Sequence, residues 1–128
     1  MAKTIALIFG VVYLIVGIIG FIPAVGGTMA MSPPTSLLGI FPINLLHNIV
    51  HVVIGIIGLS MSRTEAAGAQ FGKVFGLILI LLGIIGFFWP ANLDMTLLPL
   101  RGTDVWLHLV SGIILAAVGF GSKASATA

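Results

Sequence analysis

The chain of 128 residues contains the pentapeptide GIIGF at residues 17–21 and repeats it 66 positions later at residues 83–87. In the same register, Phe9-Gly10 returns as Phe75-Gly76. A second block returns 57 positions later without a gap: Pro42, His51 and residues 55–57 come back as Pro99, His108 and residues 112–114. The sequence therefore predicts one structural unit present twice, over about residues 5–61 and about residues 71–121.

Four apolar stretches, two in each unit, decide the class of protein. They cover residues 5–22, 43–61, 74–89 and 105–120, and none contains Asp, Glu, Lys or Arg. Each is close to the ~20 residues that a helix needs to cross a hydrocarbon core about 30 Å thick. The composition, 59% hydrophobic and 6% charged, with a mean hydropathy of +1.30, excludes a water-soluble domain. We expect an all-α membrane protein, a bundle of four transmembrane helices.

The two units are expected to be two-helix repeats related in parallel. Each holds an even number of spans, so both enter the membrane from the same side. The connectors are too short for an extramembrane domain, so residues 1–128 are predicted to form a single integral membrane domain. Pro42 is expected to open the second span, and Thr103 to cap the helix that begins at Asp104. The first stretch exceeds the ~7–15 apolar residues of a signal peptide, so we expect it to be a retained span.

Basic residues favour one orientation. Lys3, Arg63, Lys73 and Lys123 lie in segments that share one side of the membrane, with residues 62–70 as the inner connector. The positive-inside rule then predicts that both termini are cytoplasmic. No basic run or aromatic-interleaved patch points to nucleic acid.

Small residues recur at helical spacing and predict close helix packing. They are Gly55 in the second stretch, Gly72 just before the third, Gly76 within it, and Gly112 and Ala116 in the fourth. In lipid, small residues let helix backbones approach, and van der Waals contact then drives association. We expect packing within the bundle, with a homo-oligomer interface as the alternative.

The polar residues of the spans form one predicted cluster. His47 and His51 are one helical turn apart and correspond, 57 positions later, to Asp104 and His108, which are also one turn apart. The repeat predicts that His47 pairs with Asp104 and that His51 faces His108. Three further residues add amides and a hydroxyl nearby: Asn44, Asn48 and Ser111. Because ionisable groups in a membrane are costly, the cluster is the candidate functional site.

Several chemistries compete for this cluster. His51 and His108 are candidate axial ligands of a haem b, with Gly55 and Gly112 leaving room for the macrocycle. His47, His51, Asp104 and His108 are together candidate ligands of a transition metal. A chlorophyll-type pigment and proton transfer are weaker readings, and hydrolysis is weaker still. Alternatively, the side chains only hydrogen-bond across helices and bind no cofactor. The absence of cysteine excludes thiolate metal sites, iron–sulfur ligation and disulfides.

The segment LGIFPINLLHNIVH at residues 38–51, together with WLH at residues 106–108, resembles a known family. The family is the uncharacterised domain of unknown function four-three-eight-three, which comprises small four-span bacterial membrane proteins. The resemblance implies a bacterial inner-membrane protein and implies no activity. We therefore expect an accessory or structural protein, a subunit or assembly partner of a membrane complex, in contact with the lipid bilayer. The alternative is a haem- or metal-binding redox protein, and an enzyme is less favoured.

Overall fold

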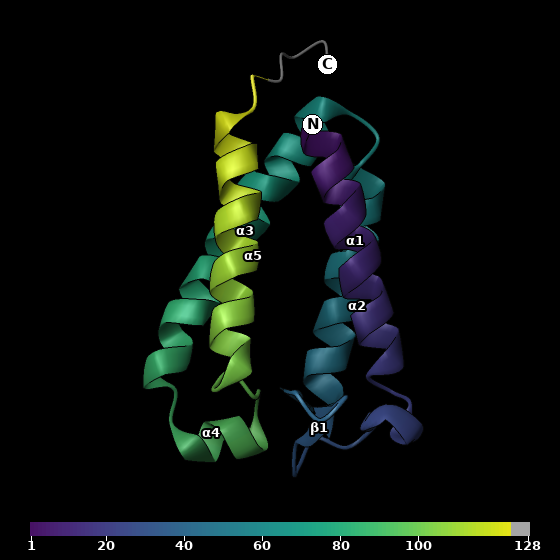
Figure 1. Cartoon of the computed structure of the whole chain (residues 1–128), viewed down its shortest axis with the longest axis vertical. Helices are drawn as coiled ribbons and strands as arrows, with labels where there is room; N and C mark the ends of the chain where they lie inside the picture. The colour runs from purple at the N-terminus through teal and green to yellow at the C-terminus, as the bar shows by residue number, and fades with distance from the viewer. Residues whose placement is uncertain (124–128) are drawn as a thin grey trace.

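Four long helices dominate the computed structural model, which describes residues 1–123. They run side by side along the long axis of the molecule (Figure 1). Their bounds are Ala2–Ile19 for α1, Leu45–Met61 for α2, Glu65–Phe88 for α3 and Thr103–Gly121 for α5. The start of α1 and the end of α5 lie at one end, and the longer connectors lie at the other. Residues 124–128 of the expected single domain lie outside the described part of the chain.

Three of these helices are long and apolar enough to cross a membrane. They are α1, α3 and α5, with 18, 24 and 19 residues, whereas α2 is apolar but has 17 residues. Large apolar side chains point outward along all four, such as Ile15 on α1, Leu81 on α3 and Ile113 on α5, each more than half exposed. An apolar surface around helices of this length is typical of a membrane protein.

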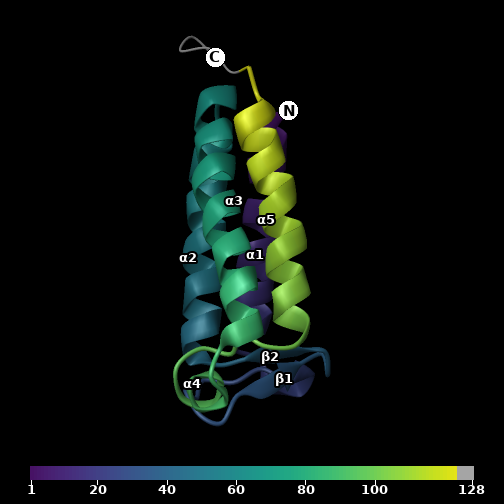
Figure 2. The same ribbon diagram turned by 90° about the vertical axis from the view of Figure 1, so that its left-hand side faces the viewer.

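The helices form two close pairs, α1 with α2 and α3 with α5 (Figure 1), and Figure 2 views the molecule with the second pair in front. Glycines line both interfaces. A side chain at Gly17 would come within 2.7 Å of the Val52 backbone, and one at Gly83 within 2.6 Å of the Leu109 side chain. The predicted packing residues lie at such contacts: Gly55 against Leu14, Gly72 against Leu115, Gly76 against Ala116, and Gly112 against Ile80. Since only glycine lacks a Cβ, these backbones approach as closely as helices can.

The two longer connectors, residues 20–44 and 89–102, contain structure that the sequence analysis did not predict. We call them the outer connectors, after the side of the membrane on which the sequence predicts them. The strands β1 (Thr35–Leu37) and β2 (Phe41–Ile43) form an antiparallel hairpin, so the chain is not all-α. Its turn has positive φ at Leu38 and Gly39, a left-handed geometry that glycine adopts without strain. The 3₁₀ turn η1 (Pro23–Val25) precedes the hairpin, and the short helix α4 (Ala91–Thr96) lies in the other connector.

Three predicted helix boundaries were wrong. Pro42 lies in β2 opposite Ser36, and the cap of α2 is Asn44, whose side chain accepts a hydrogen bond from the His47 amide. Thr103 is the first residue of α5, and its hydroxyl donates to the Ile40 carbonyl instead of capping the helix. The inner connector is only residues 62–64, because α3 already begins at Glu65.

Candidate functional site

The predicted polar cluster is assembled at the outer end of the bundle, between α2 and α5. Asn44 starts α2, which places His47 and His51 on its face toward α5. Asp104 sits in the first turn of α5, and His108 follows one turn later. These His and Asp side chains are buried, with at most 4% of each residue exposed. The fold therefore brings together residues from the two repeats that are more than 50 positions apart.

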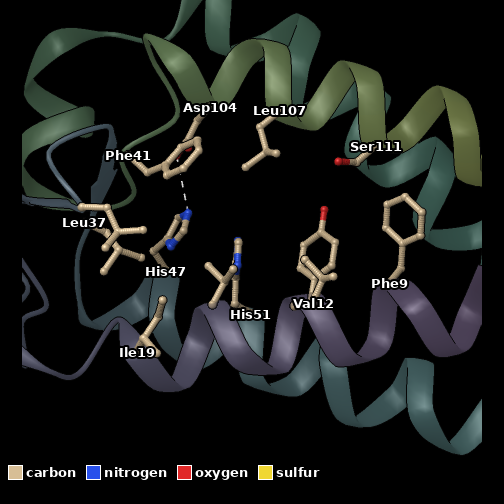
Figure 3. A pocket seen from close by; sticks show the side chains of 13 residues that line it. Phe9, Val12, Ile19, Leu37, Phe41, His47, His51, Asp104, Leu107 and Ser111 are labelled. Carbon is tan, nitrogen blue, oxygen red and sulfur yellow. Dashed lines mark ion pairs between the residues drawn. The ribbon is translucent and has the colours of Figure 1, made fainter. Parts of the chain in front are cut away.

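The pairing expected from the internal repeat is present in the structure. His47 Nε2 lies 3.4 Å from Asp104 Oδ2, within ion-pair distance, although the geometry is not that of a hydrogen bond (Figure 3). The ring of His51 stacks on that of His47 at 4.1 Å between centroids, and the ring of Tyr13 lies 4.9 Å from it on the other side. The three aromatic rings form a continuous row from the outer end inward.

The two asparagines of the cluster hold the connectors in place. Asn44 donates to the carbonyls of Met31 (3.2 Å) and Leu97 (3.0 Å), one in each outer connector. Asn48 donates to the carbonyls of Gly20 (2.7 Å) and Thr28 (3.0 Å), at the end of α1 and just beyond it. Buried backbone carbonyls need such donors, so both amides have a structural task.

A cavity of about 240 Å³ lies beside the cluster, between α1 and α5 (Figure 3). Its polar lining consists of Tyr13, His47, His51, Asp104 and Ser111. The remaining lining is apolar and comes from α1, α5 and the hairpin: Phe9, Val12, Val16, Ile19, Leu37, Leu38, Phe41 and Leu107. The site is thus an apolar pocket with polar groups along one wall, the usual composition of a small-molecule site.

Tyr13 is the site residue that sequence reasoning missed. From the sequence we expect only an interfacial or packing aromatic at this position, yet Tyr13 is 4% exposed, lines the cavity and has no hydrogen-bond partner for its hydroxyl. One signal was available in the repeat: the position 66 residues later is Leu79. A phenol at one position and an aliphatic side chain at the other mark a point where the two similar segments of sequence differ in chemistry.

A second, much smaller cavity of about 20 Å³ separates His51 and His108. This volume is enough for about one water molecule, which needs ~10–15 Å³, and not for a haem. Gly55 and Gly112 do not widen it, since they pack against Leu14 and Ile80. Haem ligation by His51 and His108 therefore stays a prediction. In this arrangement of the helices, the cavity between the two histidines is too small for the macrocycle.

Metal binding likewise stays a prediction. Among residues 1–123, no three or more His, Cys, Asp and Glu side chains are placed so that they could hold one ion. His47 and Asp104 approach each other, but His51 stacks on His47 instead of pointing its nitrogens at the same place. A shared ion would need ligand atoms converging at about 2.0–2.2 Å from one point.

The cluster contains an unusual number of buried polar atoms without partners. Tyr13 Oη, both ring nitrogens of His47, Nδ1 of His51 and both carboxylate oxygens of Asp104 make no hydrogen bond within the chain. Leaving such an atom unpaired costs about 1–3 kcal/mol. Four of the five polar residues that line the larger cavity carry such an atom.

Comparisons with known proteins agree with the resemblance seen in the sequence. The family model described as Domain of unknown function (DUF4383) matches residues 3–121. No curated protein and no solved structure matches the chain. The chain belongs to the DUF4383 family.

Proposed function

We propose that the chain is a four-span protein of the bacterial inner membrane with an accessory or structural role, as a subunit or assembly partner of a membrane complex. One observation carries the proposal: most of residues 1–123 lie in four apolar helices whose outer faces are themselves apolar. Such a molecule offers helix surfaces to lipid and to other membrane proteins, and little else to water.

The packing of α2 supports a fourth span. Its 17 residues are about 25 Å long at 1.5 Å per residue, slightly short of a bilayer core of about 30 Å. However, α2 packs beside α1 over its length, with contacts from Gly58 against Gly10 to Val52 against Gly17. A helix fixed at the same depth as a spanning neighbour crosses the same layer, and small mismatches are accommodated at low cost.

Equivalent contacts in the two helix pairs support the two-repeat architecture. A side chain at Gly10 would meet Leu59, and 66 and 57 positions later the corresponding contact joins Gly76 to Ala116. The same displacement relates two further pairs of contacts: Gly17 with Val52 to Gly83 with Leu109, and Gly55 with Leu14 to Gly112 with Ile80. A parallel duplication with an axis along the membrane normal explains why the contacts coincide.

Membrane topology is testable because the chain has no cysteine. Single cysteines are introduced at Lys3, Arg63 and Asn92, and intact cells are treated with a membrane-impermeant maleimide. We expect labelling of N92C in intact cells, and of K3C and R63C only after lysis, because positive residues favour the cytoplasmic side. Labelling of K3C and R63C from opposite sides would contradict four spans.

The accessory role has its own test. A photo-crosslinking amino acid is placed at Val53, Leu81 or Val110, which are exposed on three different helices. An accessory subunit predicts that one of these faces crosslinks to a distinct membrane protein in native membranes. It also predicts that deletion of the chain lowers the amount of that partner's assembled complex. Crosslinks to lipid and to further copies alone, with unchanged membrane complexes after deletion, would contradict the role.

A further inference from the structure

We propose that the cavity between α1 and α5 binds the ring head of a lipid-soluble quinone or quinol. This goes beyond the accessory role proposed above, and it depends only on the chain spanning the membrane, which the cysteine labelling decides separately. Four features carry the inference. They are the access route to the cavity, the spacing of its polar groups, the lack of hydrogen-bond partners for most of these groups, and the contrast with the smaller cavity between α2 and α3.

The cavity is accessible from the lipid side of the bundle. Its rim includes Val12 on α1 and Leu38 in the hairpin turn, which are 50% and 56% exposed. The hairpin residues Leu37 and Phe41 cover its outer end, and Thr103 fastens the hairpin to α5 through Ile40. A ligand therefore enters sideways between α1 and α5, and an apolar tail would remain in the bilayer.

The polar groups of the cavity lie at two levels. Asp104 and its partner His47 are at the outer level, and Ser111 is seven residues further along α5, about 10 Å deeper at 1.5 Å per residue. His51 and Tyr13 continue the row of rings from the outer level inward. A six-membered ring with oxygens on opposite sides, hydrogen-bonded at about 2.8 Å at each end, spans a distance of this order.

The available donors and acceptors match both redox forms of such a ring. The Tyr13 hydroxyl and an imidazole N–H donate to a quinone carbonyl, whereas the Asp104 carboxylate and an unprotonated imidazole nitrogen accept from a quinol hydroxyl. None of these atoms makes a hydrogen bond within the chain, and His47 Nε2 and Asp104 Oδ2 have only their ion-pair contact at 3.4 Å. An acyl chain in the same cavity would leave all of them unpaired, and buried polar groups are rarely left so.

The other repeat shows that the cavity is not a by-product of the bundle. The small cavity between α2 and α3 is its counterpart, with Leu79 at the position equivalent to Tyr13 and Ile54 at the position equivalent to Ser111. There the two hydroxyls are replaced by aliphatic side chains, and the space shrinks to about 20 Å³. Of these two seams, only the one lined by the hydroxyl-bearing residues Tyr13 and Ser111 has room for a ligand.

The test measures binding of decylubiquinone to the purified full-length protein in mild detergent, by native mass spectrometry. Tyr13→Phe and Ser111→Ala each remove one hydroxyl, and we expect affinity to fall by about 3- to 10-fold, the worth of one neutral hydrogen bond. Val12→Trp places a large ring at the rim and is expected to weaken binding at least about 10-fold. The parent protein is expected to form a one-to-one complex.

Matched controls separate the pocket from general effects. Val11→Trp adds the same ring to the same helix at an exposed residue outside the cavity, and Ser60→Ala removes an exposed hydroxyl that bonds only to its own helix. Both are expected to bind within about 2-fold of the parent, a difference of less than half a kilocalorie per mole. The melting temperature of each variant is measured to check that it folds. If Tyr13→Phe does not fold, the decylubiquinone affinity of Ser111→Ala alone tests the role of the hydroxyls.

Three results would overturn the proposal. One is the absence of a one-to-one decylubiquinone complex. Another is equal binding by Val12→Trp and Val11→Trp, which would place the ligand on the lipid-facing surface. The last is that palmitic acid binds as tightly as decylubiquinone and is insensitive to Tyr13→Phe, which would make the cavity an acyl-chain site.

Discussion

The seam between α1 and α5 and the seam between α2 and α3 have lining positions that correspond by the displacements of 66 and 57 residues in the sequence, but they differ in what fills them. The first is lined by Tyr13 and Ser111 and encloses about 240 Å³. The second has Leu79 and Ile54 at the corresponding positions and encloses about 20 Å³. We call them the open seam and the closed seam. The two seams thus differ both in the side chains at corresponding positions and in the space between them.

The difference also explains where the polar groups are unsatisfied. In the closed seam, aliphatic side chains pack against one another and need no partner. In the open seam, the lining residues carry buried hydroxyl, imidazole and carboxylate atoms that make no hydrogen bond within the chain. A buried polar group without a hydrogen-bond partner either binds a ligand or lowers the stability of the folded protein. Variants that exchange features between the seams test this interpretation.

The largest effect is expected from moving the phenol into the closed seam. Leu79→Tyr adds volume to a cavity of about 20 Å³ and buries a hydroxyl among aliphatic side chains. Overpacking and an unpaired hydroxyl together are expected to lower the free energy of unfolding by about 3 kcal/mol. Titration with SDS, followed by circular dichroism, measures this value.

Leu79→Met is the control, since it keeps the volume and polarity and is expected to cost less than about 1.5 kcal/mol. Tyr13→Phe in the open seam is expected to leave stability nearly unchanged, because the hydroxyl has no partner to lose. If Leu79→Tyr were as stable as the parent protein, the closed seam would be able to open, and the comparison would fail.

An intermediate effect is expected at the connectors that close the outer end. Asn44 caps α2 and donates to both outer connectors, whereas the equivalent position in the second repeat, Arg101, is exposed. Asn44→Ala is expected to lower the free energy of unfolding by about 2 kcal/mol through loss of the cap and two hydrogen bonds. Arg101→Ala is expected to change it by less than about 0.5 kcal/mol. Equal effects of the two variants in the same titration would show that Asn44 holds neither connector.

The smallest effect on stability is expected at the histidines between the seams. His51→Gln and His108→Gln keep a polar side chain at each position, and each is expected to cost less than about 1 kcal/mol. The visible absorption spectrum of the protein from native membranes is recorded for the parent and both variants. If the histidines only join helices, there is no Soret band to lose. A Soret band that disappears in both variants would support the haem alternative and contradict this expectation.

Much of the candidate site was predictable from the repeat. Because His47 and Asp104 are separated by the same 57 positions as His51 and His108, their approach across the bundle followed from duplication. The hairpin, α4 and the true helix starts were not predictable. The start of α5 involves a contact between segments distant in the chain, the hydrogen bond from Thr103 to Ile40, and no local pattern encodes such a bond.

By itself, the sequence determined the class of protein, the long apolar helices and the residues of the polar cluster. Uninterrupted hydrophobic stretches and helical spacing are local properties, and a chain carries them whatever its neighbours are. Only the tertiary structure decided that Tyr13 belongs to the cluster, that both asparagines are occupied with connectors, and that one seam is hollow. The physical reason is packing: whether space remains between helices depends on how side chains from three or four elements fit together, and this is fixed only when all of them are in place.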